Sequence, residues 1–256
     1  MKKPRKYKSS PPRRYADSDR RRNPWSSLIA LAVLSALVFV IAKFILWAAN
    51  TPYFSVKEVT VEGLKYLPKE SVLTEMDSVK GHNIFKLKLG ELEKKLENFP
   101  WVKQARFYRS LPSTLALKLS ERAPLALLNS KGRLIVIDYD GNLLAPPLSG
   151  EVYDLPIISN CSQGGDNYLD AVNFLRAAKT LCPQIYAEIS EVHFSEESNC
   201  ITGFIGEKAV PVKIGGGSYR EKIIKLWVLM KDSDISFNGL RYADIRFSKK
   251  IFYIPS

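Results

Sequence analysis

The side chains best suited to catalysis or metal binding are few in this chain and lie far apart. There are two histidines, His82 and His193, and three cysteines, Cys161, Cys182 and Cys200. No serine or cysteine stands near either histidine in a nucleophile motif. The cysteine spacings match no zinc motif, and no Walker loop or His-Glu-x-x-His run occurs. The sequence therefore predicts no catalytic, cofactor-binding or metal-binding residues, with the cysteines expected as small buried side chains.

Two short motifs are similar to ligand-binding loops, but each has a simpler interpretation. Residues 138–142 (DYDGN) hold the acidic residues of a calcium loop, yet the glycine is not at the sixth position that such a loop requires and no glutamate closes the loop. A hairpin turn at Asp140-Gly141 is favoured. Residues 215–218 (GGGS) precede a helix and could cradle an anion. Without a following Gly-Lys pair, they favour a strand-to-helix connection with Ser218 as the N-cap.

Positive charge is concentrated at the start of the chain. The formal net charge is +12, and residues 1–27 alone hold ten Lys or Arg against two Asp. A nucleic-acid-binding domain carries its basic surface on a folded body. Residues 1–27, which have few apolar side chains, instead predict a disordered cytoplasmic tail, and no nucleic-acid partner is expected.

Residues 28–49 form one long apolar run. As a helix at ~1.5 Å per residue the run reaches about 33 Å, enough to cross a hydrocarbon core of about 30 Å. Lys43 costs about 2.5–3.5 kcal/mol, less than the gain of about 4–8 kcal/mol from the Leu, Ile, Val and Phe side chains. A cleaved signal peptide, the alternative, has a shorter apolar core and a small-x-small site. We expect an uncleaved transmembrane helix, with residues 51–256 translocated because the basic flank stays inside.

The residues after this helix predict a small α+β domain at 53–123. Val56, Val59 and Val61 alternate as a strand. Apolar residues at helical spacing then predict two short helices, over 67–79 and 89–96. Two further strands follow at 102–109 and 115–120, with an irregularity near Gln104 and a turn at 110–113. The order β-α-α-β-β is typical of a small layered domain.

Residues 124–256 predict a mixed β domain with two flanking helices. Short strands are expected around a hairpin at 132–147, then near Ile189–Phe194, Cys200–Ile205 and Ala209–Ile214. The first helix, 166–182, is predicted to bury Leu169, Val172, Leu175 and Leu181, with Asp166 or Asn167 as its cap. The second helix, 218–232, is predicted to bury Ile223, Leu226, Trp227 and Met230.

The residues from Gly81 to Ala126 resemble a known domain. They include G-x-N-I-F at 81–85, PWV at 100–102, Ala105, Arg109, Leu111-Pro112 and ERAPLA at 121–126. This block is similar to the POTRA domain of the FtsQ/DivIB family of bacterial cell-division proteins. The order of a basic tail, one span, a POTRA domain and a β domain is similar too. Ala243–Phe247 (ADIRF) resembles that family's Asp-Leu-Arg-Tyr signature, with Ile245 and Phe247 as departures.

The C-terminal residues are the main candidates for binding a partner. In residues 242–247 apolar and polar side chains alternate, whereas residues 251–254 (IFYI) are apolar on both faces. Either both faces are buried in this chain or a partner covers one. Lys249 and Lys250 would limit indiscriminate pairing of an exposed edge. The candidate partner-binding residues are Arg246, Phe247, Lys249, Ile251, Phe252, Tyr253 and Ile254, together with Arg109, since POTRA domains bind by strand addition, as the resemblance implies. For Trp101 we favour packing at a helix–strand junction.

The resemblance implies a non-catalytic division scaffold in the bacterial inner membrane at the septum. Its implied partners are FtsB-like and FtsL-like bitopic proteins and, through them, the septal peptidoglycan synthase. One alternative is a POTRA module for outer-membrane assembly or secretion, which would have several POTRA repeats and a barrel. A less favoured alternative is a cell-wall enzyme with acidic residues converging in a cleft.

Overall fold

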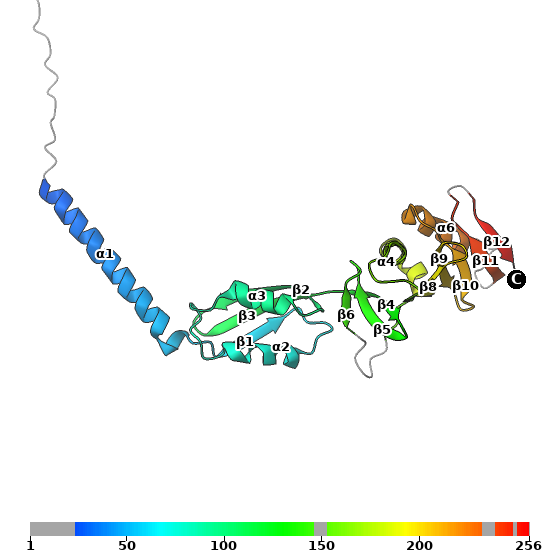
Figure 1. The fold of residues 1–256 in the computed structure, drawn as a ribbon. Helices are drawn as coiled ribbons and strands as arrows, with labels where there is room; N and C mark the ends of the chain where they lie inside the picture. Colours follow the sequence, from blue (N-terminus) through cyan, green and yellow to red (C-terminus); the bar gives the residue numbers. More distant parts are fainter. Residues whose placement is uncertain (1–23, 146–152, 232–238, 248–249, 256) are drawn as a thin grey trace, which may run out of the picture.

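A computed structural model describes residues 24–145, 153–231, 239–247 and 250–255. The elements follow one another along an extended molecule, with the long helix α1 at one end and the C-terminal strands at the other (Figure 1). The predicted basic tail lies almost wholly outside the described residues. The α+β class, with an N-terminal apolar helix, a small α+β domain and a β-rich C-terminal region, is confirmed.

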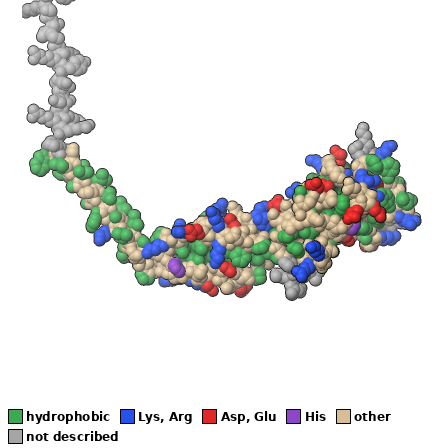
Figure 2. Space-filling model, viewed as in Figure 1, with side chains coloured by type: hydrophobic (Ala, Val, Ile, Leu, Met, Phe, Trp, Pro, Cys, Tyr) green, Lys and Arg blue, Asp and Glu red, His purple; other side chains and the backbone are tan. Residues whose placement is uncertain are grey.

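Helix α1 (Pro24–Asn50) is long and apolar enough to cross a membrane, and its side chains are exposed along nearly its whole length. Figure 2 shows hydrophobic side chains over most of α1, whereas the surface beyond it mixes charged, polar and apolar atoms. An unpaired apolar surface of this length fits a single-pass membrane protein.

Residues of the G-x-N-I-F motif at 81–85 contact the end of α1 and the segment that follows it. The side-chain amide of Asn83 donates to the carbonyl of Ala48 at 2.8 Å. Phe54 packs between Trp47 and Phe85, with ring centroids 6.3 and 5.1 Å away. The motif therefore attaches the folded domain to the helix.

The first domain has a three-stranded sheet in the order β1-β3-β2, in which β1 runs parallel and β2 antiparallel to β3. The predicted irregularity is confirmed, because the β2–β3 register shifts between Val102 and Gln104. The elements are η1 (Pro52–Phe54), β1 (Glu58–Glu62), α2 (Lys69–Met76), η2 (Asp77–Val79), α3 (Leu89–Glu97), β2 (Val102–Ser110) and β3 (Thr114–Glu121).

Apolar residues of the three strands and the two helices form one core under this sheet. Its fully buried members include Met76, Ile84, Leu96, Leu115 and Leu117. The predicted apolar spacing of both helices is confirmed, with α2 and α3 each contributing buried side chains.

The second domain has a nine-stranded sheet in the order β12-β11-β10-β9-β8-β7-β4-β5-β6. The predicted strands and the hairpin turn at Asp140-Gly141 are confirmed. The strands are β4 (Pro124–Ser130), β5 (Arg133–Asp138), β6 (Leu143–Ala145), β7 (Ile157–Ser159), β8 (Ile189–Ser195), β9 (Cys200–Ile205), β10 (Val210–Lys213), β11 (Leu240–Asp244) and β12 (Phe252–Pro255). The helices are α4 (Asp166–Leu181), α5 (Pro183–Glu188) and α6 (Tyr219–Lys231).

The helices pack on the sheet through a different stripe of residues from the one predicted. Helix α4 buries Tyr168, Ala171, Val172, Phe174, Leu175 and Ala178. The prediction was right for Val172 and Leu175 but wrong for Leu169 and Leu181, which are 45% and 48% exposed. The buried stripe thus includes the small residues Ala171 and Ala178. Gly165, neither Asp166 nor Asn167, occupies the N-cap position.

Helix α6 shows the same kind of difference. Ile223, Leu226 and Leu229 are buried, as predicted for the first two, whereas Trp227 is 46% exposed. Trp227 and Leu181 instead line a shallow apolar hollow on the surface. The carbonyl of Ser218 accepts from the Lys222 amide at 3.3 Å, so Ser218 stands at the start of the helix.

A third cluster of buried residues joins the two domains. Trp101 packs with Leu127, Val136 and Leu144, and its ring lies 5.6 Å from that of Tyr66. The expectation that Trp101 packs only a helix–strand junction was too narrow, because most of its partners belong to the second domain.

Candidate functional site

Strand β12 lies at the edge of the nine-stranded sheet. It pairs antiparallel with β11, and among the described residues no strand covers its outer side. Figure 1 shows β12 at the end of the molecule far from α1. An edge strand carries unpaired backbone N–H and C=O groups that can pair with another chain. This edge is therefore the candidate site.

The predicted residues of β12 are all on the surface. Phe252, Tyr253 and Ile254 are 51%, 45% and 53% exposed. Phe252 is opposite Asp244 and Ile254 is opposite Tyr242, whereas Tyr253 is opposite the fully buried Ala243. Because neighbouring side chains on a strand alternate, Phe252 and Ile254 share one sheet face and Tyr253 lies on the other. Both faces of β12 thus present apolar surface to solvent.

The other predicted residues lie close to β12. Phe247 is half exposed, and its ring lies 5.3 Å from that of Phe252 in an edge-to-face arrangement. Ile251 is half-buried and packs against the domain core. Lys250 is exposed, and Lys249 lies outside the described residues. Phe247 and Phe252 therefore place aromatic surface next to the sheet edge.

An ion pair braces the end of β11 beside this site. Arg246 donates to the Asp244 carboxylate, with its Nη2 2.7 Å from Oδ2. Burial by itself would raise the pKa of Asp244, but the side-chain and backbone hydrogen bonds from Arg246 lower the pKa overall. Asp244, a polar residue of the alternating segment, is nevertheless only 5% exposed. Arg246 thus has a structural partner within the chain.

Arg109 lies in the first domain, far along the chain from β12. Its guanidinium donates to the carbonyls of Ile84 and Leu87, at 2.7 and 2.8 Å. These bonds hold the loop before α3. The structure does not bring Arg109 together with the residues around β12.

The edge of β2 in the first domain is already occupied. Glu97 accepts from the backbone N–H of Ala105 at 3.2 Å, and Glu93 accepts from that of Phe107 at 2.9 Å. Both glutamates come from α3. These carboxylates take the place that a partner strand would need, so strand addition along this part of β2 is blocked.

Ser159, Glu191 and His193 form the cluster closest to a catalytic arrangement. The Ser159 hydroxyl donates to Glu191, and its oxygen also lies 3.0 Å from Nδ1 of His193. In a nucleophilic triad the imidazole lies between the carboxylate and the hydroxyl. Here the same nitrogen, Nδ1 of His193, faces both groups, with Oε1 of Glu191 3.9 Å away, so the hydroxyl and the carboxylate are not on opposite sides of the ring. The arrangement fits a surface hydrogen-bond network.

The cysteines are three free thiols. Cys200 is buried as expected, but Cys161 and Cys182 are only half-buried. Burial raises the pKa of Cys161 to about 11, and nearby Asp170 acts in the same direction. The Cys161 thiol therefore stays protonated at neutral pH and is a poor nucleophile.

Sequence reasoning missed the contacts that fix the junction between the domains. The carboxylate of Glu121 accepts from three successive backbone N–H groups, those of Lys65, Tyr66 and Leu67, at 3.0, 2.6 and 2.9 Å. The next residue, Arg122, is 2.8 Å from the buried carboxylate of Asp138 in the second domain. The Glu-Arg pair before Pro124 was a visible signal, but its partners are distant in sequence.

Comparison with known proteins agrees with this architecture. The family described as "POTRA domain, FtsQ-type" matches residues 54–122. The cell division protein FtsQ of Geotalea daltonii is 28% identical over 212 residues, covering 79% of this chain and 76% of the relative. FtsQ of Syntrophotalea carbinolica is 27% identical over 251 residues, covering 91% and 88%. FtsQ of a Geobacter species is 27% identical over 215 residues, covering 79% and 77%.

The family match covers the three-stranded domain, and the relatives extend through the nine-stranded one. The β-α-α-β-β order of the three-stranded domain lies within the matched residues. Residues 54–122 therefore form an FtsQ-type POTRA domain, and the chain is similar to FtsQ cell-division proteins over most of its length.

Proposed function

We propose that this protein is a non-catalytic scaffold of the division machinery that offers β12 to a partner as a free sheet edge. One observation carries the proposal: β12 ends the nine-stranded sheet with apolar side chains half exposed on both faces. Main-chain hydrogen bonds along such an edge give affinity, and the alternating side chains give specificity.

The proposed setting follows from the charge at the two ends of α1. The basic residues before the helix favour a cytoplasmic N-terminus, with the folded domains on the outer face of the inner membrane at the septum. The proposed partners are FtsB-like and FtsL-like bitopic proteins, whose extracytoplasmic segments would reach β12. Through them the scaffold would act on the septal peptidoglycan synthase.

The exposed side chains set the scale of the interaction. A buried aromatic residue covers about 150–250 Å², so covering the exposed half of Phe252 or Tyr253 removes roughly 100 Å² from water. At about 25 cal/mol per Å², each contributes about 2–3 kcal/mol before the costs of association. Truncating one of them should weaken binding about 30- to 140-fold, since 1.4 kcal/mol is tenfold.

The test is binding of the full-length protein, in phospholipid nanodiscs, to a purified FtsB-like and FtsL-like pair. Deleting residues 248–256 should abolish binding while insertion and fold persist. Because that deletion also uncovers β11, the sharper variant is Phe252→Ala with Ile254→Ala, which leaves the backbone in place. Its matched control is Ile224→Ala with Val228→Ala on α6, since these two side chains are 51% and 49% exposed.

Loss of affinity in the β12 variant but not in the α6 control supports the proposal. In dividing cells, a photocrosslinker at Phe247 or Tyr253 should capture the same partner. Unchanged binding after the deletion, or an equal loss in both double variants, would show that β12 is not the recognition edge.

A further inference from the structure

The second domain has a large open groove far from β12, with a cavity volume of about 870 Å³. It lies at the carboxyl ends of the parallel strands β4, β7 and β8. After β4 the chain turns into the neighbouring strand β5, whereas after β7 it crosses over to helix α4. Connections that leave adjacent parallel strands in different directions open a crevice, which is where ligands bind in open α/β sheets.

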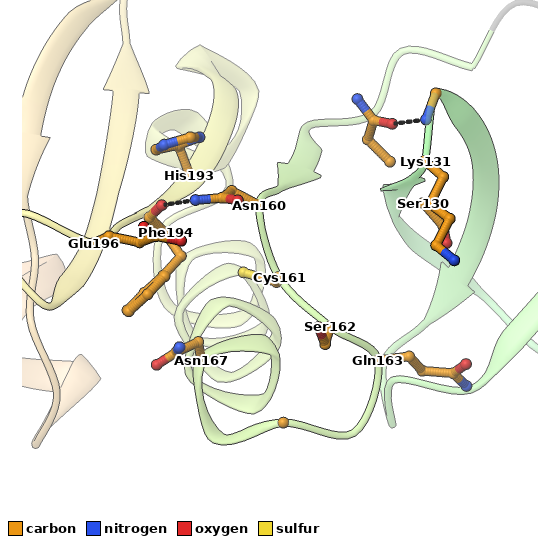
Figure 3. Close-up of a pocket in the computed structure, with 13 residues that line it drawn as sticks. Ser130, Lys131, Asn160, Cys161, Ser162, Gln163, Asn167, His193, Phe194 and Glu196 are labelled. Carbon is orange, nitrogen blue, oxygen red and sulfur yellow. Dashed lines mark hydrogen bonds between the residues drawn. The ribbon is translucent and has the colours of Figure 1, made fainter.

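The two sides of the groove come from these two connections. Figure 3 shows Ser130 and Lys131 of the β4–β5 turn on one side, and Asn167, Phe194 and Glu196 on the other. The segment from Asn160 to Gln163 runs between them. A groove of this volume lies within the range of small-molecule sites.

The lining is rich in side chains that both donate and accept hydrogen bonds. Four amides, from Asn129, Asn160, Gln163 and Asn167, line the groove. The nitrogen of Asn160 donates to the carbonyl of Phe194 at 2.8 Å, and the oxygen of Asn129 accepts from Gly132 at 3.0 Å. The other atom of each side-chain amide, the oxygen of Asn160 and the nitrogen of Asn129, has no hydrogen-bond partner among the described residues. These groups are held in place and can still bond a ligand.

The charges of the groove favour a neutral ligand. Lys131 and Glu196 are the only Lys, Arg, Asp or Glu among the lining residues of the described groove, and their charges cancel. A polyanion such as nucleic acid requires several cations along its path. The half-buried Phe194 adds an aromatic surface beside the polar groups. The lining therefore suits a molecule with many hydroxyl or amide groups and some apolar surface.

A peptide fits this groove less well than a saccharide does. An extended peptide is usually bound along a free strand edge. Here β4 and β7 are paired with each other, and β7 with β8, so no strand edge faces the groove. Recognition must come from side chains, which match sugar hydroxyls and acetamido groups.

We propose that this groove binds a neutral, N-acetylated oligosaccharide of two or three rings. The acetamido group has one N–H and one C=O, which pair with the side-chain amides, and its methyl group packs on the aromatic surface. The proposal goes beyond the scaffold function and depends on none of the residues of β12, so each can fail without the other.

The test uses the full-length protein in phospholipid nanodiscs and chitotriose as the probe, read by saturation-transfer-difference NMR. Sugar-based detergents must be avoided because their headgroups would compete. We expect transfer to the acetamido methyl protons well above that with empty nanodiscs. Gln163→Ala with Asn167→Ala should reduce the transfer at least fivefold, and the matched control Gln184→Ala on α5 should leave it unchanged.

A second variant and two further probes separate the alternatives. Ser130→Trp, at an exposed turn position, should fill the groove and abolish transfer without touching the core. Cellotriose, which has no acetamido groups, and a neutral alanine tripeptide should both give weaker transfer. No transfer above empty nanodiscs, or transfer insensitive to both groove variants, overturns the proposal. Equal transfer from cellotriose overturns the acetamido assignment, and preference for the tripeptide overturns the saccharide class.

Discussion

Replacing Glu121 should release the loop that begins the junction between the two domains. Its carboxylate accepts from the backbone N–H groups of Lys65, Tyr66 and Leu67. Lys65 is exposed, so water can replace the lost acceptor there, whereas Tyr66 and Leu67 are half-buried. Leaving two such amides without a partner costs about 1–2 kcal/mol each. We therefore expect Glu121→Ala to destabilise this loop by about 2–4 kcal/mol.

Hydrogen–deuterium exchange of the full-length protein in nanodiscs measures this effect directly. Because 1.4 kcal/mol is a factor of ten, amides 65–67 should exchange about 30- to 1,000-fold faster in Glu121→Ala. The exchange rate in Glu121→Gln should lie between those of the unchanged protein and Glu121→Ala. The glutamine oxygen still accepts from a backbone N–H, but its NH₂ group faces another N–H and cannot accept from it. The matched control is Glu62→Ala, an exposed glutamate on nearby β1. Unchanged exchange at amides 65–67 in a folded Glu121→Ala protein would show that Glu121 does not hold this loop.

Three other changes have defined outcomes. Burial alone would raise the pKa of Asp138, but hydrogen bonds from Asn142 and Arg122 lower this pKa overall. The ionised Asp138 carboxylate therefore stabilises the fold above about pH 4, and this stabilisation is lost as the pH falls through the lowered pKa. Asp138→Asn should flatten the fall in melting temperature between pH 6 and pH 3. Glu93→Ala with Glu97→Ala should speed deuterium exchange at the two edge amides of β2 and cause concentration-dependent self-association, measured by analytical ultracentrifugation. Phe174→Ala should remove about 3–5 kcal/mol from the second domain in urea unfolding, because this side chain is fully buried.

Local patterns predicted the elements because each is written in a short stretch of sequence. The alternation after Phe54, the helical spacing in 67–79 and the turn at Asp140-Gly141 depend on neighbours only a few residues away. Even the irregularity near Gln104 was visible, since the alternation of apolar residues shifts there. These features need no knowledge of the rest of the fold.

The choice of buried helix face was harder to predict because it depends on the partner surface. On α4, Leu169 and Leu181 are large and apolar yet exposed, whereas the small Ala171 and Ala178 are fully buried. Hydrophobicity alone ranks leucine above alanine, whereas close packing against a sheet rewards small side chains. On α6, Leu229 is buried whereas the larger Trp227 is exposed.

Contacts between distant segments could not be predicted from local patterns. Glu121 binds amides more than fifty residues earlier, and Arg109 binds carbonyls more than twenty residues earlier. In each case a charged side chain on a strand satisfies the backbone of a loop. The sequence shows the charge, but only the fold shows which backbone groups lack a partner.

The four edge strands of the two sheets, β1, β2, β6 and β12, differ in how well they are protected against pairing with another chain. In β1, Glu58 and Glu62 place exposed charges at both ends of the strand. In β2 two edge amides are taken by α3, and β6 has only three residues. Charged, covered or very short edges are how proteins avoid unwanted pairing. Among the described strands, β12 is the edge that keeps exposed apolar side chains on both faces, which costs solubility unless a partner covers it. The protection of the other three edges therefore strengthens the assignment of β12 as the recognition edge.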